Sequence, residues 1–291
     1  MERRLRYYLG IILKPLIKSN KKLYSRFSFA GDVEIYSDSK RLFLHCHKDE
    51  ISNSIYFTGV FGDFEGESLR LWKECILSLK PRLILDIGAY SGIYSLLAAL
   101  YSDKSIIHAF EPNKLTFKIL ERNIGLNAFT NIIPCNYGIS TSSGEQTFYN
   151  WGNAANSGMS LVNHKYINKN LGKTRFQVRD FLEVYEGFNQ KIELIKMDIE
   201  RAELPLIKHI KDILNKDRPI VFCEILDQEA YAEFGEFFNE IDYKYLKIDD
   251  QNKCFHQVSN MAVETLVGLN WIFYPVERGH MLSSLTASPV V

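Results

Sequence analysis

The chain has 291 residues, 46% of them hydrophobic and 24% charged, which excludes general disorder and suits a soluble protein with one large core or two small ones. Its 35 Lys and Arg residues balance 35 Asp and Glu residues, so no overall field exists to attract nucleic acid. The five cysteines lack paired spacing, which favours a reducing compartment over a disulfide framework or a zinc site.

The N-terminal segment differs in charge from the rest of the chain. Residues 1–30 hold eight Lys or Arg side chains and one Glu, a charge of +7 that the remainder balances. The apolar run at 7–13 is far shorter than the roughly 20 residues of a transmembrane helix, and lysines follow where a signal peptide needs small residues. We predict a cytoplasmic protein whose basic segment, residues 1–28, either docks on the domain or lies on an anionic membrane surface.

A β-rich lead-in with a helix at 66–79 is predicted over residues 29–81. Beyond it, short apolar runs alternate with helical stretches, a pattern typical of a mostly parallel sheet with helices on both faces. Strands are predicted at 82–87, 105–110, 131–135, 174–181, 191–199, 218–226, 243–248 and 269–275. Helices are predicted at 93–101, 113–127, 204–214 and 229–241, with an inserted hairpin and loop at 141–173. The sequence therefore predicts a doubly wound, Rossmann-like α/β domain over 82–280 and a flexible tail at 281–291.

Acidic residues stand at or near the ends of four predicted strands: Asp86, Glu111, Asp198 and Glu224. Ligands of open α/β sheets bind beyond the carboxyl ends of the strands, so these acids mark a candidate site. After Asp86, Gly88 permits a sharp turn and Gly92 permits close approach of a ligand or a backbone. Asp86 itself could anchor an ammonium group, directly or through water.

The glycine pattern after the first of these strands excludes two common nucleotide sites. No G-x-x-x-x-G-K-[ST] phosphate loop is present, and Tyr90 fills the position of the second glycine in the dinucleotide pattern. Glu111, however, follows Asp86 by 25 residues at the tip of the adjacent strand, the spacing that brings a carboxylate to the hydroxyls of a ribose. Two such charge-assisted hydrogen bonds contribute about 1.5–3 kcal/mol each.

Four segments, in this order, resemble the FkbM-type S-adenosylmethionine-dependent methyltransferases, which are class I, Rossmann-like enzymes: LILDIGAYSGIYS, HAFEPNKLTFKILERNIGLN, VRDFLEVY and IELIKMDIERAEL. The resemblance covers about residues 82–226. It implies that S-adenosylmethionine is the cofactor, that the carboxylate after the second strand binds its ribose, and that a turn at 138–140 borders its adenine. The candidate cofactor-binding residues are Asp86, Gly88, Tyr90, Gly92, Glu111, Pro112, Gly138 and Ile139.

The same resemblance matches several acids to positions that family members carry. Asp180 matches an acid before the fourth strand, and Asp198, Glu200 and Glu203 match the segment K-x-D-x-E-G-A-E. The chain departs from the family pattern at two positions. Tyr90 stands where members usually have Asn, and Arg201 where they usually have Gly.

Methyl transfer to a hydroxyl requires an in-line approach and the removal of a proton from the acceptor. Asp198 is the first candidate for this base, followed by Glu200 and Glu224. A divalent cation held by these carboxylates is a less favoured alternative, and no metal ligands are assigned. We predict O-methylation of a sugar, glycan or other polar metabolite, an acceptor class that comes from the resemblance. N- or carboxyl methylation, or a non-catalytic nucleoside-binding module, are the alternatives.

Overall fold

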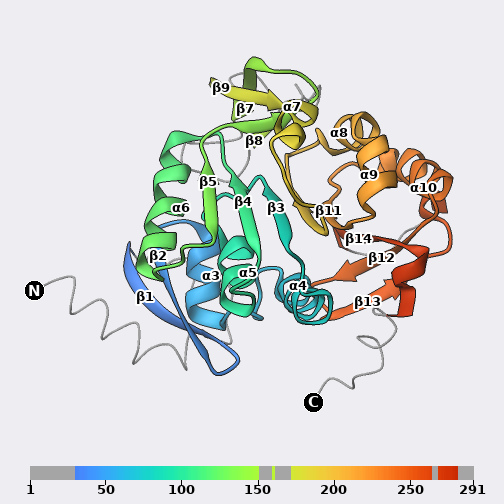
Figure 1. The fold of residues 1–291 in the computed structure, drawn as a ribbon. Helices are drawn as coiled ribbons and strands as arrows, with labels where there is room; N and C mark the ends of the chain where they lie inside the picture. The colour runs from blue at the N-terminus through green and yellow to red at the C-terminus, as the bar shows by residue number, and fades with distance from the viewer. Residues whose placement is uncertain (1–29, 151–158, 161–171, 264–267, 281–291) are drawn as a thin grey trace, which may run out of the picture.

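The computed structural model describes residues 30–150, 159–160, 172–263 and 268–280 (Figure 1). The predicted basic segment at 1–28 and the predicted tail at 281–291 lie outside these residues. Within the described part of the chain, every helix is too short or too polar to cross a membrane.

An eight-stranded sheet forms the centre of the fold. Its order is β13 (Cys254–Gln257), β12 (Tyr243–Asp249), β14 (Asn270–Pro275), β11 (Ile220–Glu224), β10 (Leu194–Met197), β3 (Leu83–Ile87), β4 (Ile106–Phe110) and β5 (Ile132–Cys135). The strands from β11 to β5 are parallel, and β14, β12 and β13 add antiparallel neighbours. All five residues of β3 are buried, as expected for a central strand covered on both faces.

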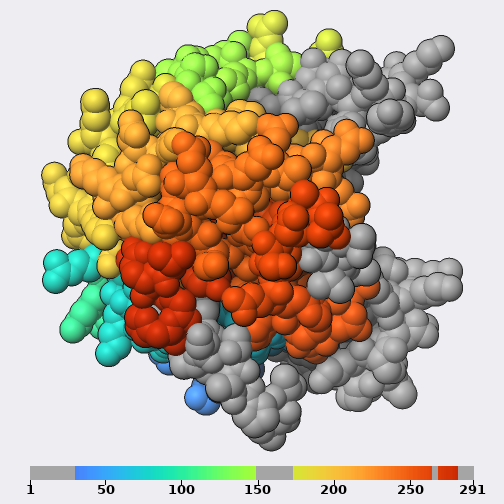
Figure 2. All heavy atoms as spheres, turned by 90° about the vertical axis from the view of Figure 1, so that its right-hand side faces the viewer, coloured from blue at the N-terminus to red at the C-terminus, as the bar shows by residue number. Residues whose placement is uncertain are grey.

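Helices cover both faces of this sheet. One face carries α4 (Gly66–Leu79), α5 (Ile93–Tyr101) and α6 (Lys114–Leu126); the other carries α7 (Phe181–Glu186), α8 (Glu203–His209), α9 (Lys211–Asp217) and α10 (Tyr231–Glu240). Alternation along β3 explains the two layers, because Ile84 packs against the first set while Leu83 and Leu85 pack against the second. The C-terminal half of the chain, orange to red, forms most of the face in Figure 2. The predicted Rossmann-like fold is confirmed.

The lead-in is more helical than its sequence predicts. After the hairpin of β1 (Ala30–Ser37) and β2 (Lys40–His47), the chain forms α3 (Glu50–Thr58), which was not predicted. The hairpin docks on α6, where the side-chain oxygens of Asn127 and Asn123 accept hydrogen bonds from the backbone N–H groups of Phe43 and His45. The lead-in is thereby fixed to the helix that follows β4.

A second, four-stranded sheet corrects two sequence predictions. Its order is β6 (Gly138–Ser140), β9 (Gly172–Asp180), β7 (Gly144–Asn150) and β8 (Met159–Ser160). The segment expected as a turn at 138–140 is the strand β6, which pairs in parallel with β9. Strand β9, predicted as part of the main sheet, belongs to this second sheet instead. The insertion at 141–173 supplies β7 and β8.

The helix predicted at 204–214 is divided in two at Ile210. This residue ends α8 and precedes α9, with φ −97° and ψ 19°, outside the α-helical region. Its side chain stays buried beside Ile207 and Leu214, so the apolar pattern continues across the break. Pro205 lies in the first turn of α8, where its missing N–H needs no partner.

Candidate functional site

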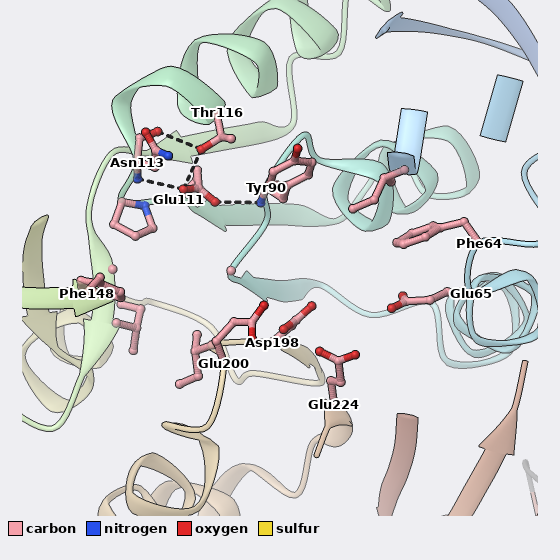
Figure 3. A pocket seen from close by; sticks show the side chains of 16 residues that line it. Phe64, Glu65, Tyr90, Glu111, Asn113, Thr116, Phe148, Asp198, Glu200 and Glu224 are labelled. Atoms are coloured by element: carbon pink, nitrogen blue, oxygen red, sulfur yellow. Dashed lines mark hydrogen bonds between the residues drawn. The ribbon is translucent and has the colours of Figure 1, made fainter. Parts of the chain in front are cut away.

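A pocket of about 210 Å³ opens at the carboxyl edge of the parallel strands (Figure 3). The chain runs from β3 to β4 and β5 on one side and crosses back to β10 and β11 on the other, so the strand order reverses beside β3. Such a switch point is where open α/β sheets bind ligands. The lining residues are Ile51, Phe64, Glu65, Gly88, Tyr90, Glu111, Pro112, Asn113, Thr116, Gly138, Ile139, Phe148, Asp198, Ile199, Glu200 and Glu224.

Most residues predicted for the site line this pocket, and two do not. The lining includes all three predicted catalytic acids and six of the eight predicted cofactor residues; Asp86 and Gly92 are outside it. Sequence reasoning missed Glu65 and Phe64, which come from the turn before α4, and Phe148 of β7. None of these three belongs to a motif of the parallel strands.

Glu111 follows β4 and is held in place by three donors. The N–H groups of Tyr90 and Asn113 donate to its carboxylate at 3.0 and 2.8 Å, and the Thr116 hydroxyl donates at 2.9 Å. Asn113 also caps α6 by accepting from the N–H of Leu115. Glu111 Oε2 accepts one of the three bonds and Oε1 two, so Oε2 retains acceptor capacity at the pocket wall.

Burial raises the pKa of Glu111 to about 7, although its three hydrogen bonds favour the ionised form. The donors are fixed by the backbone of the loop after β3 and by the first turn of α6. A ligand hydroxyl that donates to this carboxylate would therefore meet an acceptor whose orientation is already set.

The loop between β3 and α5 depends on both of its glycines. A Cβ at Gly88, where φ is +86°, would lie 1.8 Å from the backbone oxygen of Asp198. At Gly92, where φ is +91°, it would lie 2.4 Å from the Cδ1 atom of Leu120 in α6. Gly88 thus allows the β3 and β10 loops to approach each other at the pocket. Gly92 serves helix packing rather than ligand approach.

Asp86 is turned away from the pocket. Its side chain is 1% exposed, and its Oδ2 atom accepts hydrogen bonds from the hydroxyl of Ser95 at 2.6 Å and from the N–H of Ser95 at 3.0 Å. Burial raises the pKa of Asp86 to about 6. The carboxylate ties the end of β3 to α5, and the direct contact with a ligand expected from its strand-end position is not supported by its placement.

Both departures from the family pattern fall at left-handed backbone positions. Tyr90 has φ +50° and Arg201 has φ +82°, the region that Asn and Gly tolerate best. The Tyr90 hydroxyl lies 3.1 Å from Nε2 of His47, which links the loop to the lead-in hairpin. Arg201 is outside the pocket lining and pairs with Asp227 at 3.6 Å. The arginine therefore adds its bulk and charge outside the pocket.

Three carboxyl groups from different elements face one another in the pocket (Figure 3). Asp198 follows β10, Glu224 ends β11, and Glu65 precedes α4. Burial, together with the neighbouring Asp198 carboxylate, holds the pKa of Glu224 well above its usual range, so Glu224 donates a hydrogen bond to Asp198.

One buried cation lies beside these acids. Lys196 Nζ is 3.7 Å from Asp198 Oδ2, and its side chain is 3% exposed. Burial opposes its charge, yet the nearby carboxylates of Asp198 and Glu65 outweigh burial and hold the pKa of Lys196 above its ordinary value.

The three other acids that the family resemblance matched, Glu200, Glu203 and Asp180, have different roles. Glu200 lines the pocket, and burial followed by repulsion from Asp198 raises its pKa to about 8. Glu203 is buried in the first turn of α8, where an acid favours the helix dipole, and it accepts from the N–H of Ile199 at 2.8 Å. Asp180 caps α7 and lies 2.8 Å from His209, outside the pocket lining.

The raised pKa values predict an unusual pH dependence of stability. In the ligand-free protein the pKa values of Glu111 and Glu203 are about 7 and that of Glu200 is about 8, against an ordinary value of 4.5. The native state then binds more protons than the unfolded state between about pH 4.5 and 8. We expect the free energy of unfolding to fall as pH rises through this range. The loss of stability, which comes from ionising these buried acids, is absent below the range and complete above it.

Urea denaturation at pH 5 and pH 8 measures this effect. Glu200→Gln, which cannot ionise, should reduce the difference between the two pH values, and Glu229→Gln, at an exposed position, should leave it unchanged. If the free energy of unfolding is instead higher at pH 8 than at pH 5, and Glu200→Gln reduces that difference, the placement of Glu200 and Glu111 is contradicted.

One group elsewhere in the described residues has donors suited to a metal. The ligand atoms of Asp249, Cys254 and His256 lie within 4.8 Å of one another. Asp249, however, caps the turn that follows it, accepting from the N–H groups of Gln251 and Asn252 and from the Asn252 side chain. The turn accounts for the position of this carboxylate, and we assign no metal site.

The fold and the pocket together define a Rossmann-like α/β protein with an acidic binding site at its topological switch point. The model of the methyltransferase FkbM domain matches residues 86–251, more than half of the chain. The chain therefore belongs to the FkbM methyltransferase domain family, as the sequence motifs predicted.

One curated relative and several solved structures are similar to parts of this chain. Hexuronic acid methyltransferase AglP of Haloferax volcanii is 32% identical over 132 residues, which cover 45% of this chain and 51% of that protein. The chain thus matches about half the length of that relative. The FkbM methyltransferase of Methylobacillus flagellatus KT covers 91% of this chain and 60% of its own, with 12% identity and a TM-score of 0.44. The precorrin-6y C5,15-methyltransferase of Geobacter metallireducens GS-15 covers 72% and 89%, with 12% identity and a TM-score of 0.41.

Proposed function

We propose that this protein transfers a methyl group from S-adenosylmethionine to a hydroxyl of a sugar, a glycan or another polar metabolite. The observation that carries the proposal is the placement of Glu111 and Asp198 in one pocket, in a chain of the FkbM family. The 32% identity to a hexuronic acid methyltransferase supports a saccharide acceptor. Oxygen-directed transfer rests on that likeness and on a carboxylate base in the pocket.

The pocket residues fit the proposed cofactor. Glu111 presents an acceptor for ribose hydroxyls. Because Gly88 has no Cβ, the loop after β3 can lie against the backbone of Asp198 at the pocket. The described lining residues include several carboxyl groups and no Lys, Arg or His, which suits a cationic sulfonium nucleoside.

S-adenosylmethionine, when bound, would supply a methyl group whose carbon a nucleophile can attack, with S-adenosylhomocysteine as the leaving group. The chain contributes a proton acceptor and a defined orientation. Asp198, paired with Lys196 and hydrogen-bonded to Glu224, presents a carboxyl oxygen placed to accept the hydroxyl proton. Glu200 borders the same space and is the second candidate. The carboxyl groups would disfavour an acidic group on the acceptor at this point, so we propose a neutral hydroxyl as the methylated position.

Calorimetry followed by a transfer assay tests this function. Wild-type protein should bind S-adenosylmethionine and S-adenosylhomocysteine but not NAD, and should transfer labelled methyl groups into an extract of glycans and polar metabolites. Binding without transfer to any acceptor would favour a non-catalytic nucleoside-binding module, and binding of NAD alone would contradict the proposal.

A further inference from the structure

Glu65 lies at the end of the pocket away from Glu111 and was not expected there. It precedes α4 in the turn that leads out of the β-rich segment, and its side chain points toward Asp198 and Glu224 (Figure 3). Its backbone is left-handed, with φ +42°, a conformation that costs a non-glycine residue about 1 kcal/mol or more. Such strain persists where the surrounding structure holds a residue for another reason.

Among the residues that the structure describes, a neutral donor holds the Glu65 carboxyl group. The hydroxyl of Tyr94, in α5, donates to its Oε2 atom at 2.6 Å. Removal from water, with repulsion from Asp198, raises the pKa of Glu65, whereas the charge of Lys196 lowers it. The buried ammonium of Lys196 lies near the carboxyl groups of both Asp198 and Glu65, and a cationic ligand group would find a counter-charge here.

Asp86 does not offer the same contact. Ser95 donates both its hydroxyl and its N–H to Asp86, and the side chain is 1% exposed and outside the pocket lining. Asp86 therefore fixes the loop by joining the end of β3 to α5, whereas the Glu65 carboxyl group faces the pocket.

The inference rests on the proposed function, because it concerns the amino-acid arm of the same cofactor. If the ribose lies at Glu111, the remainder of the molecule extends along the pocket toward Asp198 and Glu65. The ammonium group of that arm needs a carboxylate partner. We infer that Glu65, and not Asp86, binds the α-ammonium group of the cofactor, with Tyr94 orienting the carboxyl group and Asp86 positioning the loop through Ser95.

A pair of ligands that differ only in the amino group tests this assignment. S-adenosylhomocysteine and its deaminated analogue would be compared by calorimetry on wild-type protein, Glu65→Gln, Asp86→Asn and the matched control Glu74→Gln, a partly exposed acid of α4. We expect the wild type to prefer the amino ligand by about 10–100-fold, the range of one hydrogen bond to a charged group. Glu65→Gln should lose most of this preference, whereas Asp86→Asn and Glu74→Gln should keep it.

Several outcomes would overturn the inference. If Glu65→Gln keeps the preference, or Asp86→Asn loses it, the ammonium lies elsewhere. If Glu65→Gln does not fold, Tyr94→Phe leaves the carboxyl group in place without its donor; a reduced preference then supports the assignment, and an unchanged one contradicts it. Failure of the wild type to bind S-adenosylhomocysteine at all would instead refute the proposed function, so the two failures are distinguishable.

Discussion

Asp198→Asn is expected to lower the rate of methyl transfer at saturating cofactor by about 10²–10⁴-fold, the usual contribution of a general base. An amide cannot accept the proton of the acceptor hydroxyl, and burial, the main cause of the raised pKa of Glu224, still disfavours the ionised form of this neighbour in the variant. Affinity for S-adenosylhomocysteine should stay within a few-fold of the wild-type value. The rate is measured with labelled cofactor, and the affinity by calorimetry.

The control for this variant must account for Lys196, which pairs with Asp198 inside the protein. Loss of one partner leaves a buried charge less well compensated, so the unfolding transition of each variant is measured first. Asp227→Asn is the matched control, because Asp227 follows the neighbouring strand β11 but pairs with Arg201 outside the pocket. Full activity in Asp198→Asn would remove this residue from the mechanism.

Glu111→Ala is expected to lower affinity for S-adenosylhomocysteine by about 10²–10⁴-fold. The estimate takes two charge-assisted hydrogen bonds to the ribose at about 1.5–3 kcal/mol each. A 2′,3′-dideoxy analogue of the ligand should bind wild-type protein more weakly by a similar factor. The variant should bind the ligand and the analogue almost equally.

Two further measurements make this result specific. The N–H groups of Tyr90 and Asn113 lose their acceptor in Glu111→Ala, so the free energy of unfolding is compared with that of Glu121→Ala, an exposed acid of α6. If Glu111→Ala still discriminates against the dideoxy analogue as wild type does, the ribose is bound by another residue.

The strand-end acids could be predicted because their positions follow from local sequence. Each apolar run of a predicted buried strand ends at or near an acid or a glycine, and parallel strands bring these ends to one edge of the sheet. Glu111, Asp198 and Glu224 accordingly lie in one pocket, as predicted. What the local sequence could not reveal is the direction of a side chain, and Asp86, at the end of the same kind of strand, faces Ser95 instead.

Glu65 and α3 were missed for a different reason. The position of Glu65 depends on how α4 packs against the sheet, which no short pattern around the residue reports. In α3, Ser52, Asn53 and Ser54 are buried polar residues that hide the helical apolar period. The cap at Asp49, which accepts from the N–H of Ser52, was the one local signal of this helix.

The division at Ile210 shows a further limit of apolar periodicity. Ile207, Ile210 and Leu214 are all buried, as a continuous helix would require, although the backbone leaves the helical region at the middle residue. The pattern reports which side chains face the core and not whether the hydrogen-bond ladder is continuous. The strand at 138–140 was likewise missed because its partner β9 lies far along the chain.

A crystal structure of the protein soaked with S-adenosylhomocysteine tests the account most directly. We predict that both ribose hydroxyls lie within hydrogen-bond distance of the Glu111 carboxylate, about 2.5–3.0 Å, and that the sulfur lies on the side of the pocket that holds the Asp198 carboxyl group. A nucleoside bound elsewhere, or one whose ribose turns away from Glu111, would contradict it.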